Sequence, residues 1–183
     1  MKLIISVLLC SLMLSPCIAS SSYADKATET GAKLVDEYTK ASSKGKQRFI
    51  TELQILTHKN PENSNVRKMY ANVLLADKQY QSGLQQIEII NKKYGTPSFL
   101  LTACMVKERL NMPFNGCYKD IIRIMDKNNV KDVNYLTALF FASDPRFDEE
   151  RRKQLRADEI SGEQAAYYNL SREDFLLNLY PSP

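Results

Sequence analysis

Residues 61–94 read PENSNVRKMYANVLLADKQYQSGLQQIEIINKKY, and this stretch decides the fold. Apolar side chains recur at helical spacing on both sides of the polar turn at Asp77, which predicts a pair of helices joined by that turn. A shift of 34 residues lays the turn and the second helix on the following segment, so that Phe114 falls on Tyr80. A period of this length is typical of stacked helical repeats, which usually bind other proteins.

The same pattern continues along the chain, and proline, glycine or asparagine separates its segments. No alternating strand pattern of useful length interrupts it. The sequence therefore predicts an all-α fold, an antiparallel stack of helix hairpins in a single domain over 25–183. We expect a first hairpin over 25–60, repeats over 61–96 and 97–128, and C-terminal capping helices over 129–183. Helices are predicted over 25–43, 46–58, 65–76, 80–93, 98–110, 114–127, 131–142, 149–157, 163–169 and 171–180.

Residues 1–24 have the pattern of a signal peptide. Lys2 precedes an apolar stretch over 3–14, and Pro16 ends it. Cleavage is expected after Ala24, with Ala19 as the alternative. A dozen apolar residues are too few to span a bilayer, and nothing later in the chain is longer and equally apolar. We therefore expect a periplasmic or secreted protein without stable membrane insertion.

Charge and motif content argue against nucleic-acid binding and against catalysis. Removing Lys2 with the signal leaves 24 Lys and Arg against 21 Asp and Glu, a net charge of +3 that is spread along the chain. His58 is the only histidine, which excludes a histidine-rich metal site. No nucleophile, zinc or phosphate-loop motif is present. The sequence therefore predicts no enzyme activity, no cofactor and no metal site.

The 61–94 repeat resembles the tetratricopeptide repeat family. Arg67 replaces the customary tryptophan, and Ile90 stands where alanine is usual. The resemblance extends to roughly half of the mature chain and implies a right-handed superhelix in which small residues allow close helix approach. The positions that match the family pattern are Pro61, Tyr70, Ala71, Leu74, Tyr80, Gly83 and Ile87.

Cys104 and Cys117 are the only cysteines that remain after signal cleavage. In an exported protein, two such cysteines are expected to pair. The resemblance implies that they face each other, because the shift of 34 residues puts Cys117 on Gly83 at the close helix contact and Cys104 beside it. Such a short loop stabilises by about 3 kcal/mol. The alternative is a pair of buried free thiols.

The resemblance also implies a groove lined by the first helix of each repeat. Lys68 and Asn72 resemble the lysine and asparagine that hold a terminal carboxylate in some family members, although Ala103 stands where such a clamp has its second asparagine. A mixed basic and apolar lining favours an amphipathic helix or loop of some acidic character. The predicted partner-binding residues are Asn65, Lys68, Met69, Asn72, Leu75, Phe99, Thr102, Val106 and Arg109.

Two functions fit these features. The first is a non-catalytic adaptor of the cell envelope that binds a protein or peptide, for example during assembly of a secretion, pilus or cell-wall complex. The alternative is a periplasmic immunity protein that neutralises an antibacterial toxin. Compact size, a signal peptide, one disulfide and no catalytic motif suit both equally. A hydrolase would have to draw its activity from scattered carboxylates.

Overall fold

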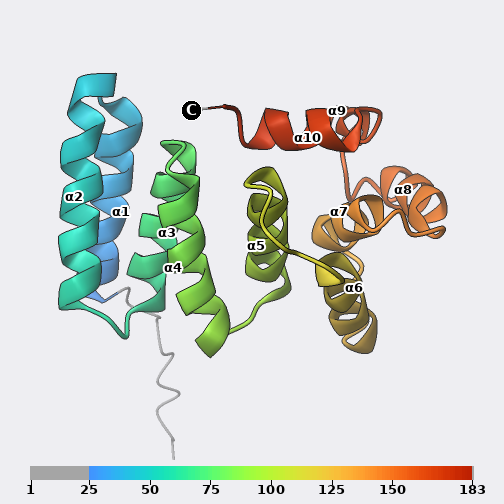
Figure 1. The fold of residues 1–183 in the computed structure, drawn as a ribbon, viewed down its shortest axis with the longest axis horizontal. Coiled ribbons are helices and arrows are strands. Elements are labelled where there is room, and N and C mark those ends of the chain that lie inside the picture. The colour runs from blue at the N-terminus through green and yellow to red at the C-terminus, as the bar shows by residue number, and fades with distance from the viewer. Residues whose placement is uncertain (1–24, 183) are drawn as a thin grey trace, which may run out of the picture.

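The structure is a computed structural model that describes residues 25–182. The predicted signal peptide lies outside these residues. Within them the chain forms ten helices and no strand, which confirms the all-α fold class (Figure 1). The helices are α1 (Lys26–Lys40), α2 (Ser43–Lys59), α3 (Ser64–Ala76), α4 (Tyr80–Lys93), α5 (Pro97–Arg109), α6 (Cys117–Lys127), α7 (Val133–Phe141), α8 (Phe147–Arg156), α9 (Gly162–Tyr167) and α10 (Arg172–Leu179).

Side-chain caps begin several of these helices. The Asn63 side chain accepts hydrogen bonds from the first backbone amides of α3, and Asp132 does the same for α7. Ser161 forms a complete capping box with Gln164 at α9, and Ser171 caps α10. Each cap satisfies amides that have no partner within the helix, so these short polar segments fix where the chain turns.

The start of α6 differs from the sequence prediction. A helix was expected from Phe114, but α6 begins at Cys117. Gly116 precedes it with φ of +73°, a left-handed conformation that glycine adopts readily, and Pro113 lies just upstream. The half-buried Phe114 ring instead makes an edge contact with the Tyr118 ring, at 5.9 Å between centres. The second helix of this repeat therefore starts three residues later than predicted.

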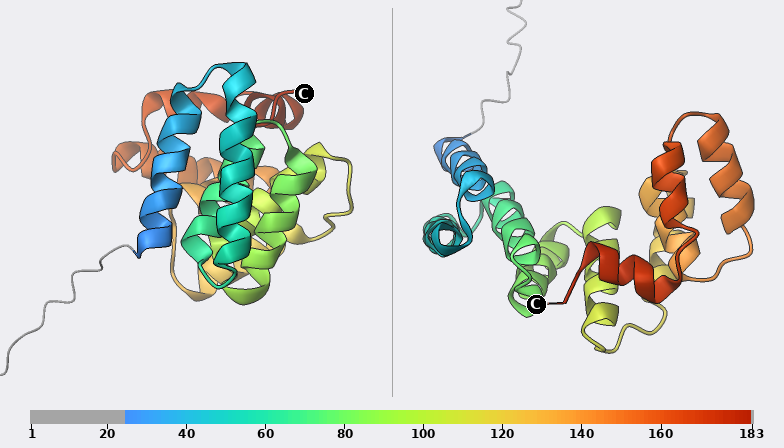
Figure 2. Two further views of the ribbon diagram at one scale, coloured as in Figure 1. Left: turned by 90° about the vertical axis from the view of Figure 1, so that its left-hand side faces the viewer. Right: turned by 90° about the horizontal axis from the view of Figure 1, so that it is seen from above.

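Neighbouring helices pack against each other in chain order from α1 to α8. Helices α1, α2 and α3 contact one another, α3 pairs with α4, and α5 stands between α4 and α6. Helix α10 then returns across the end of α5, roughly perpendicular to the stack, and brings residues 181 and 182 to the end of the α3–α4 hairpin (Figures 1 and 2). The last helix thus bridges elements that are far apart in sequence.

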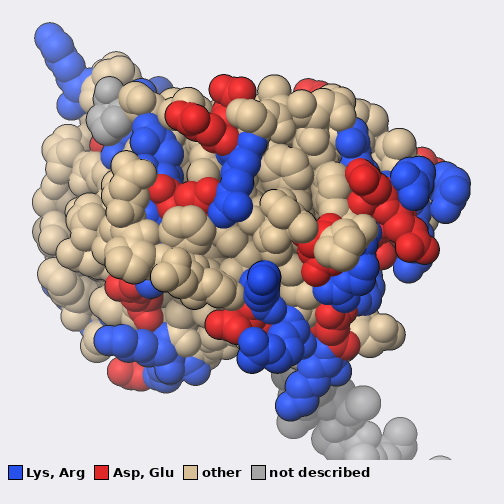
Figure 3. Space-filling view, turned by 45° about the vertical axis from the view of Figure 1, so that its right-hand side comes forward, with Lys and Arg blue, Asp and Glu red and all other residues tan. Residues whose placement is uncertain are grey.

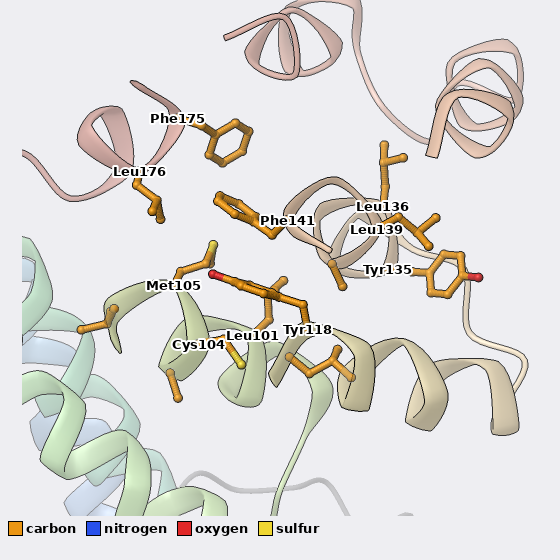
Figure 4. Packing of buried hydrophobic residues seen from close by; sticks show 14 of the residues in the cluster. Leu101, Cys104, Met105, Tyr118, Tyr135, Leu136, Leu139, Phe141, Phe175 and Leu176 are labelled. Carbon is orange, nitrogen blue, oxygen red and sulfur yellow. The ribbon is translucent and has the colours of Figure 1, made fainter. Parts of the chain in front are cut away.

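The core consists of two clusters. A small one joins α1, α2 and α3, and a large one runs from α3 and α4 to α10. In the large cluster the Tyr118 ring stacks on Phe141 at 5.2 Å, and Phe175 of α10 meets the edge of Phe141 at 5.3 Å (Figure 4). Leu176 lies beside Phe175 and is also buried. Because α10 contributes to this core, its position is fixed by apolar burial.

Cys104 of α5 and Cys117 of α6 form the predicted disulfide, with their Cα atoms 5.9 Å apart. The bond joins a residue inside α5 to the first residue of α6, because α6 starts late. The close contact at Gly83 is with Leu75: a Cβ on Gly83 would lie 2.6 Å from Leu75 Cδ2. Leu75 therefore fills the space that glycine leaves within the α3–α4 hairpin.

Candidate partner-binding groove

Of the predicted lining residues, Lys68 of α3 and Phe99 of α5 form the one pair with a close contact among the described residues. The Lys68 ammonium of α3 lies 5.6 Å from the centre of the Phe99 ring of α5. Such a contact contributes about 0.5–1 kcal/mol where it is partly exposed, and it holds the lysine chain in place. Asn65 and Asn72 of α3 are exposed, and Thr102 of α5 is half-buried. The part of the predicted groove made by Asn65, Lys68, Asn72, Phe99 and Thr102 is called the α3–α5 groove below.

Three apolar residues of the predicted lining have packing roles instead. Met69 fills space against α1, since a Cβ on Gly31 would lie 2.8 Å from its sulfur. Leu75 covers Gly83, as described above. Val106 has no exposed surface and is a core residue. Phe99 is thus the main apolar side chain that the α3–α5 groove offers.

A sequence signal for the burial of Val106 exists. Seven of the eight residues in the segment Phe99-Leu-Leu-Thr-Ala-Cys-Met-Val106 are apolar, and a helix that is apolar on most of its circumference is largely buried. The structure agrees, because α5 contacts α4, α6, α7 and α10. Only one side of the helix remains for a partner. The residues 101 and 103–106 are all buried.

Arg109, the other predicted groove cation, binds the chain's own C-terminal residues. Its Nε donates a hydrogen bond to the carbonyl oxygen of Tyr180 at 2.8 Å, and its Nη2 donates to Ser182 Oγ at 3.2 Å. These partners are more than 70 positions away in the chain. No local pattern could have indicated this contact, and Arg109 lies apart from the α3–α5 groove.

A second charged group lies where α10 crosses α5 and α6. Arg172 Nη2 donates to Glu108 Oε2 at 2.8 Å, and the Tyr118 hydroxyl donates to the same oxygen at 2.6 Å. The guanidinium also lies over the rings of Phe114, Tyr118 and Phe141 at 5.3–5.8 Å. Burial, together with the Glu108 carboxylate, raises the pKa of Tyr118. No local sequence pattern indicates this group, since 64 positions separate Glu108 from Arg172.

This ion pair forms one wall of a hollow of about 470 Å³. The geometry is that of a bidentate arginine–carboxylate pair, which ties α10 to α5. The charges are therefore engaged in holding the fold together. The hollow is lined by Glu108, Arg109, Asn111, Arg172, Glu173, Leu176 and Leu177.

A third charged group links α6, α7 and the start of α8. Arg146 pairs with Asp126 at 3.0 Å and with Asp144 at 2.8 Å, and Tyr135 donates to Asp126 at 2.9 Å. The hydrogen bond from Lys131, with others from Arg146 and Tyr135, lowers the pKa of Asp126 from 3.8 to about 2. These residues connect consecutive helices at their ends and so have a structural role.

Residues 25–182 lack the features of several other classes of site. That range holds no group of His, Cys, Asp and Glu side chains placed to bind a metal ion. None of its helices has the length and apolarity needed to cross a membrane. On the face shown in Figure 3, basic and acidic side chains lie next to one another, and neither sign covers a continuous area. His58 is exposed in the last turn of α2.

No protein-family model matches this chain, and neither a curated protein nor a solved structure does. Over residues 25–182 the protein is a stack of helices with one disulfide and a last helix that bridges the stack.

Proposed function

We propose that this chain is an exported, non-catalytic adaptor of tetratricopeptide type that binds a protein or peptide partner in the cell envelope. The observation that carries the proposal is the position of Lys68 over Phe99, which places one side chain of α3 beside one side chain of α5. Exposed amides flank this pair at Asn65 and Asn72. A surface of this kind suits a partner in the assembly of a secretion, pilus or cell-wall complex.

Export is supported by the disulfide and by the predicted signal peptide. Disulfides form and persist in oxidising compartments and are rare in the cytosol. The Cys104–Cys117 bond joins α5 to α6. Helix α5 also carries Phe99 and Thr102 of the α3–α5 groove. We therefore infer a periplasmic or secreted protein.

The engagement of the partly buried carboxylates supports a non-catalytic role. Glu108 is held by Arg172, and Asp126 by Arg146. A general acid or base has to exchange protons with a substrate near neutral pH. Asp126, with its lowered pKa, stays ionised under those conditions, and its arginine and lysine partners belong to the fold.

The chemistry of the groove favours an acidic, amphipathic partner. Lys68 is paired with no carboxylate among the described residues, so its charge is available to an incoming acidic group. Phe99 offers an apolar face beside it, and amide side chains such as Asn72 both donate and accept hydrogen bonds. A helix or loop with one acidic and one apolar residue on the same side meets these groups.

Site-specific crosslinking in the native host tests this proposal. A photoreactive residue replaces Asn72 in the groove, and a control replaces Gln54, which is exposed on α2. We expect one defined adduct from position 72 and none from position 54. Lys68→Glu should reduce the adduct at least about tenfold, because like charges across an interface cost more than 1.4 kcal/mol.

Arg109 is not mutated in this experiment, because its replacement would also remove a hydrogen bond to the C-terminal residues. The proposal fails if positions 72 and 54 give the same adducts. It also fails if Lys68→Glu leaves the adduct from position 72 undiminished while helix content is unchanged.

A further inference from the structure

The residues that follow α10 are bound in an ordered way by side chains from distant helices. Residues 180–182 present three successive carbonyl oxygens, and each accepts one hydrogen bond from a side chain. The donors come from the end of α5, the first residue of α4 and the turn before it (Figure 1). In chain order of the acceptors they are Arg109 Nε at 2.8 Å, the Tyr80 hydroxyl at 2.5 Å and Lys78 Nζ at 2.7 Å.

Proline keeps this segment extended. Pro181 has no backbone N–H and disfavours the helical region for the residue before it, so α10 ends at Leu179. Tyr180 accordingly has φ of −130° and ψ of 72°. An extended chain exposes its carbonyl groups to neighbours, and side-chain donors satisfy them here. The contact therefore consists of backbone recognition and does not continue the helix packing.

One side chain of the segment is anchored. Tyr180 is 8% exposed, and its ring meets the edge of the Tyr80 ring at 5.7 Å between centres. Pro181 and Ser182 are exposed. Backbone hydrogen bonds combined with one buried side chain are the usual arrangement in extended-peptide binding sites, where the bonds give affinity and the anchor gives specificity.

The side chains that hydrogen-bond to the segment come from outside α10. Phe175 and Leu176 fix α10 in the core, as Figure 4 shows, while the contacts of residues 180–182 are made with α4, α5 and the α3–α4 turn. Phe175 and Leu176 do not belong to the segment, so their burial continues to hold α10 when residues 180–182 are released. Arg109 also borders the hollow of about 470 Å³, so there is room beside the segment for a longer ligand.

We infer that Lys78, Tyr80 and Arg109 form a binding site for an extended peptide that carries tyrosine followed by proline. The chain's own C-terminal residues occupy this site as an internal competitor. A partner with such a segment binds by displacing them. The inference goes beyond the proposed α3–α5 groove, because it uses different side chains and does not need Lys68 or Phe99.

Peptide binding to the purified protein tests the inference. The probe is a fluorescein-labelled peptide with the sequence of residues 179–183, Leu-Tyr-Pro-Ser-Pro. Two variants free the site: a chain that stops after Leu179, and the full-length chain with Tyr180→Ala. We expect saturable binding to both, measured by fluorescence anisotropy. The native chain should bind at least about tenfold more weakly, because a tethered competitor has an effective concentration in the millimolar range.

Single substitutions in the protein and a reordered peptide distinguish specific from unspecific binding. In the truncated chain, Arg109→Gln and Tyr80→Phe should each weaken binding at least about fivefold, since each removes one hydrogen bond to a carbonyl. Arg123→Gln, an exposed arginine on α6, should leave it unchanged. A peptide with tyrosine and proline exchanged should bind at least tenfold more weakly.

The inference is overturned if neither variant binds the peptide while its circular dichroism is native. Equal binding of the exchanged peptide overturns it as well. If truncation unfolds the chain, Tyr180→Ala decides the question alone. Absence of peptide binding would not change the crosslink at position 72, so the two experiments test the two proposals independently.

Discussion

Breaking the Cys104–Cys117 bond should lower the free energy of unfolding by about 3 kcal/mol. The two residues are 13 positions apart, so the bond closes a short loop. In the chain-entropy description, a loop of about 15 residues restricts the unfolded chain by that amount. For a domain of about 160 residues, each kcal/mol shifts the melting temperature by about 2–4 °C, so a decrease of about 6–12 °C is expected.

Thermal unfolding of the chain over residues 25–183 with and without reductant measures this decrease. The variant with Cys104→Ala and Cys117→Ala provides the control, because it should melt near the reduced protein and show no response to reductant. Alkylation in denaturant without reductant should find no free thiol. Two alkylated cysteines, or a melting temperature that reductant does not change, would refute the reasoning.

Three further changes have defined outcomes. Gly83→Val should lower the free energy of unfolding by about 2 kcal/mol in denaturant, because the added Cβ would lie 2.6 Å from the Leu75 side chain. The control Gly162→Val has open space around it and should change that free energy by no more than about 0.5 kcal/mol. Arg172→Met should cost about 2 kcal/mol by the same measurement, because it leaves the largely buried Glu108 unpaired. The lowered pKa of Asp126 makes a contribution that is complete above pH 4 and lost as the pH falls to about 2. Asp126→Asn should therefore reduce the acid sensitivity of unfolding between pH 4 and 2 by about 1 kcal/mol, after solvent screening.

Local sequence patterns were sufficient to predict most of the helices. The helix over 80–93 was predicted at the bounds of α4, because polar residues precede it and glycine and proline follow it. Short-range chemistry decides such boundaries, and the sequence displays it directly. The α6 start shows where a repeat comparison fails. The shift of 34 residues transferred a helix start from Tyr80 to Phe114, but Pro113 and Gly116 impose a turn there.

The site was less predictable because spacing places a residue on a helix without saying what packs against it. Val106 shares a face with Arg109 in the predicted groove, yet α5 is enclosed by four other helices and Val106 has no exposed surface. Lys68 and Phe99 were predicted to line one groove, and the structure brings them together. The partners of Arg109 depend on where α10 crosses the stack, and no local signal specifies that crossing.

The separation of Phe99 from Arg109 sets a condition on any ligand that uses both. They lie near opposite ends of α5, ten residues apart, which corresponds to about 15 Å along a helix. A ligand confined to Lys68 and Phe99 does not touch the C-terminal residues. In that case, truncation after Leu179 leaves the crosslink at position 72 unchanged.

A ligand long enough to reach Arg109 has to displace the C-terminal residues from it. Coupling between two binding events is reciprocal, so such a ligand and the C-terminal segment weaken each other's binding by the same factor. Truncation after Leu179 then raises the affinity of that ligand for the groove. Comparing the crosslink at position 72 in the native and truncated chains therefore measures whether the partner spans both ends of α5 or only the end that carries Phe99.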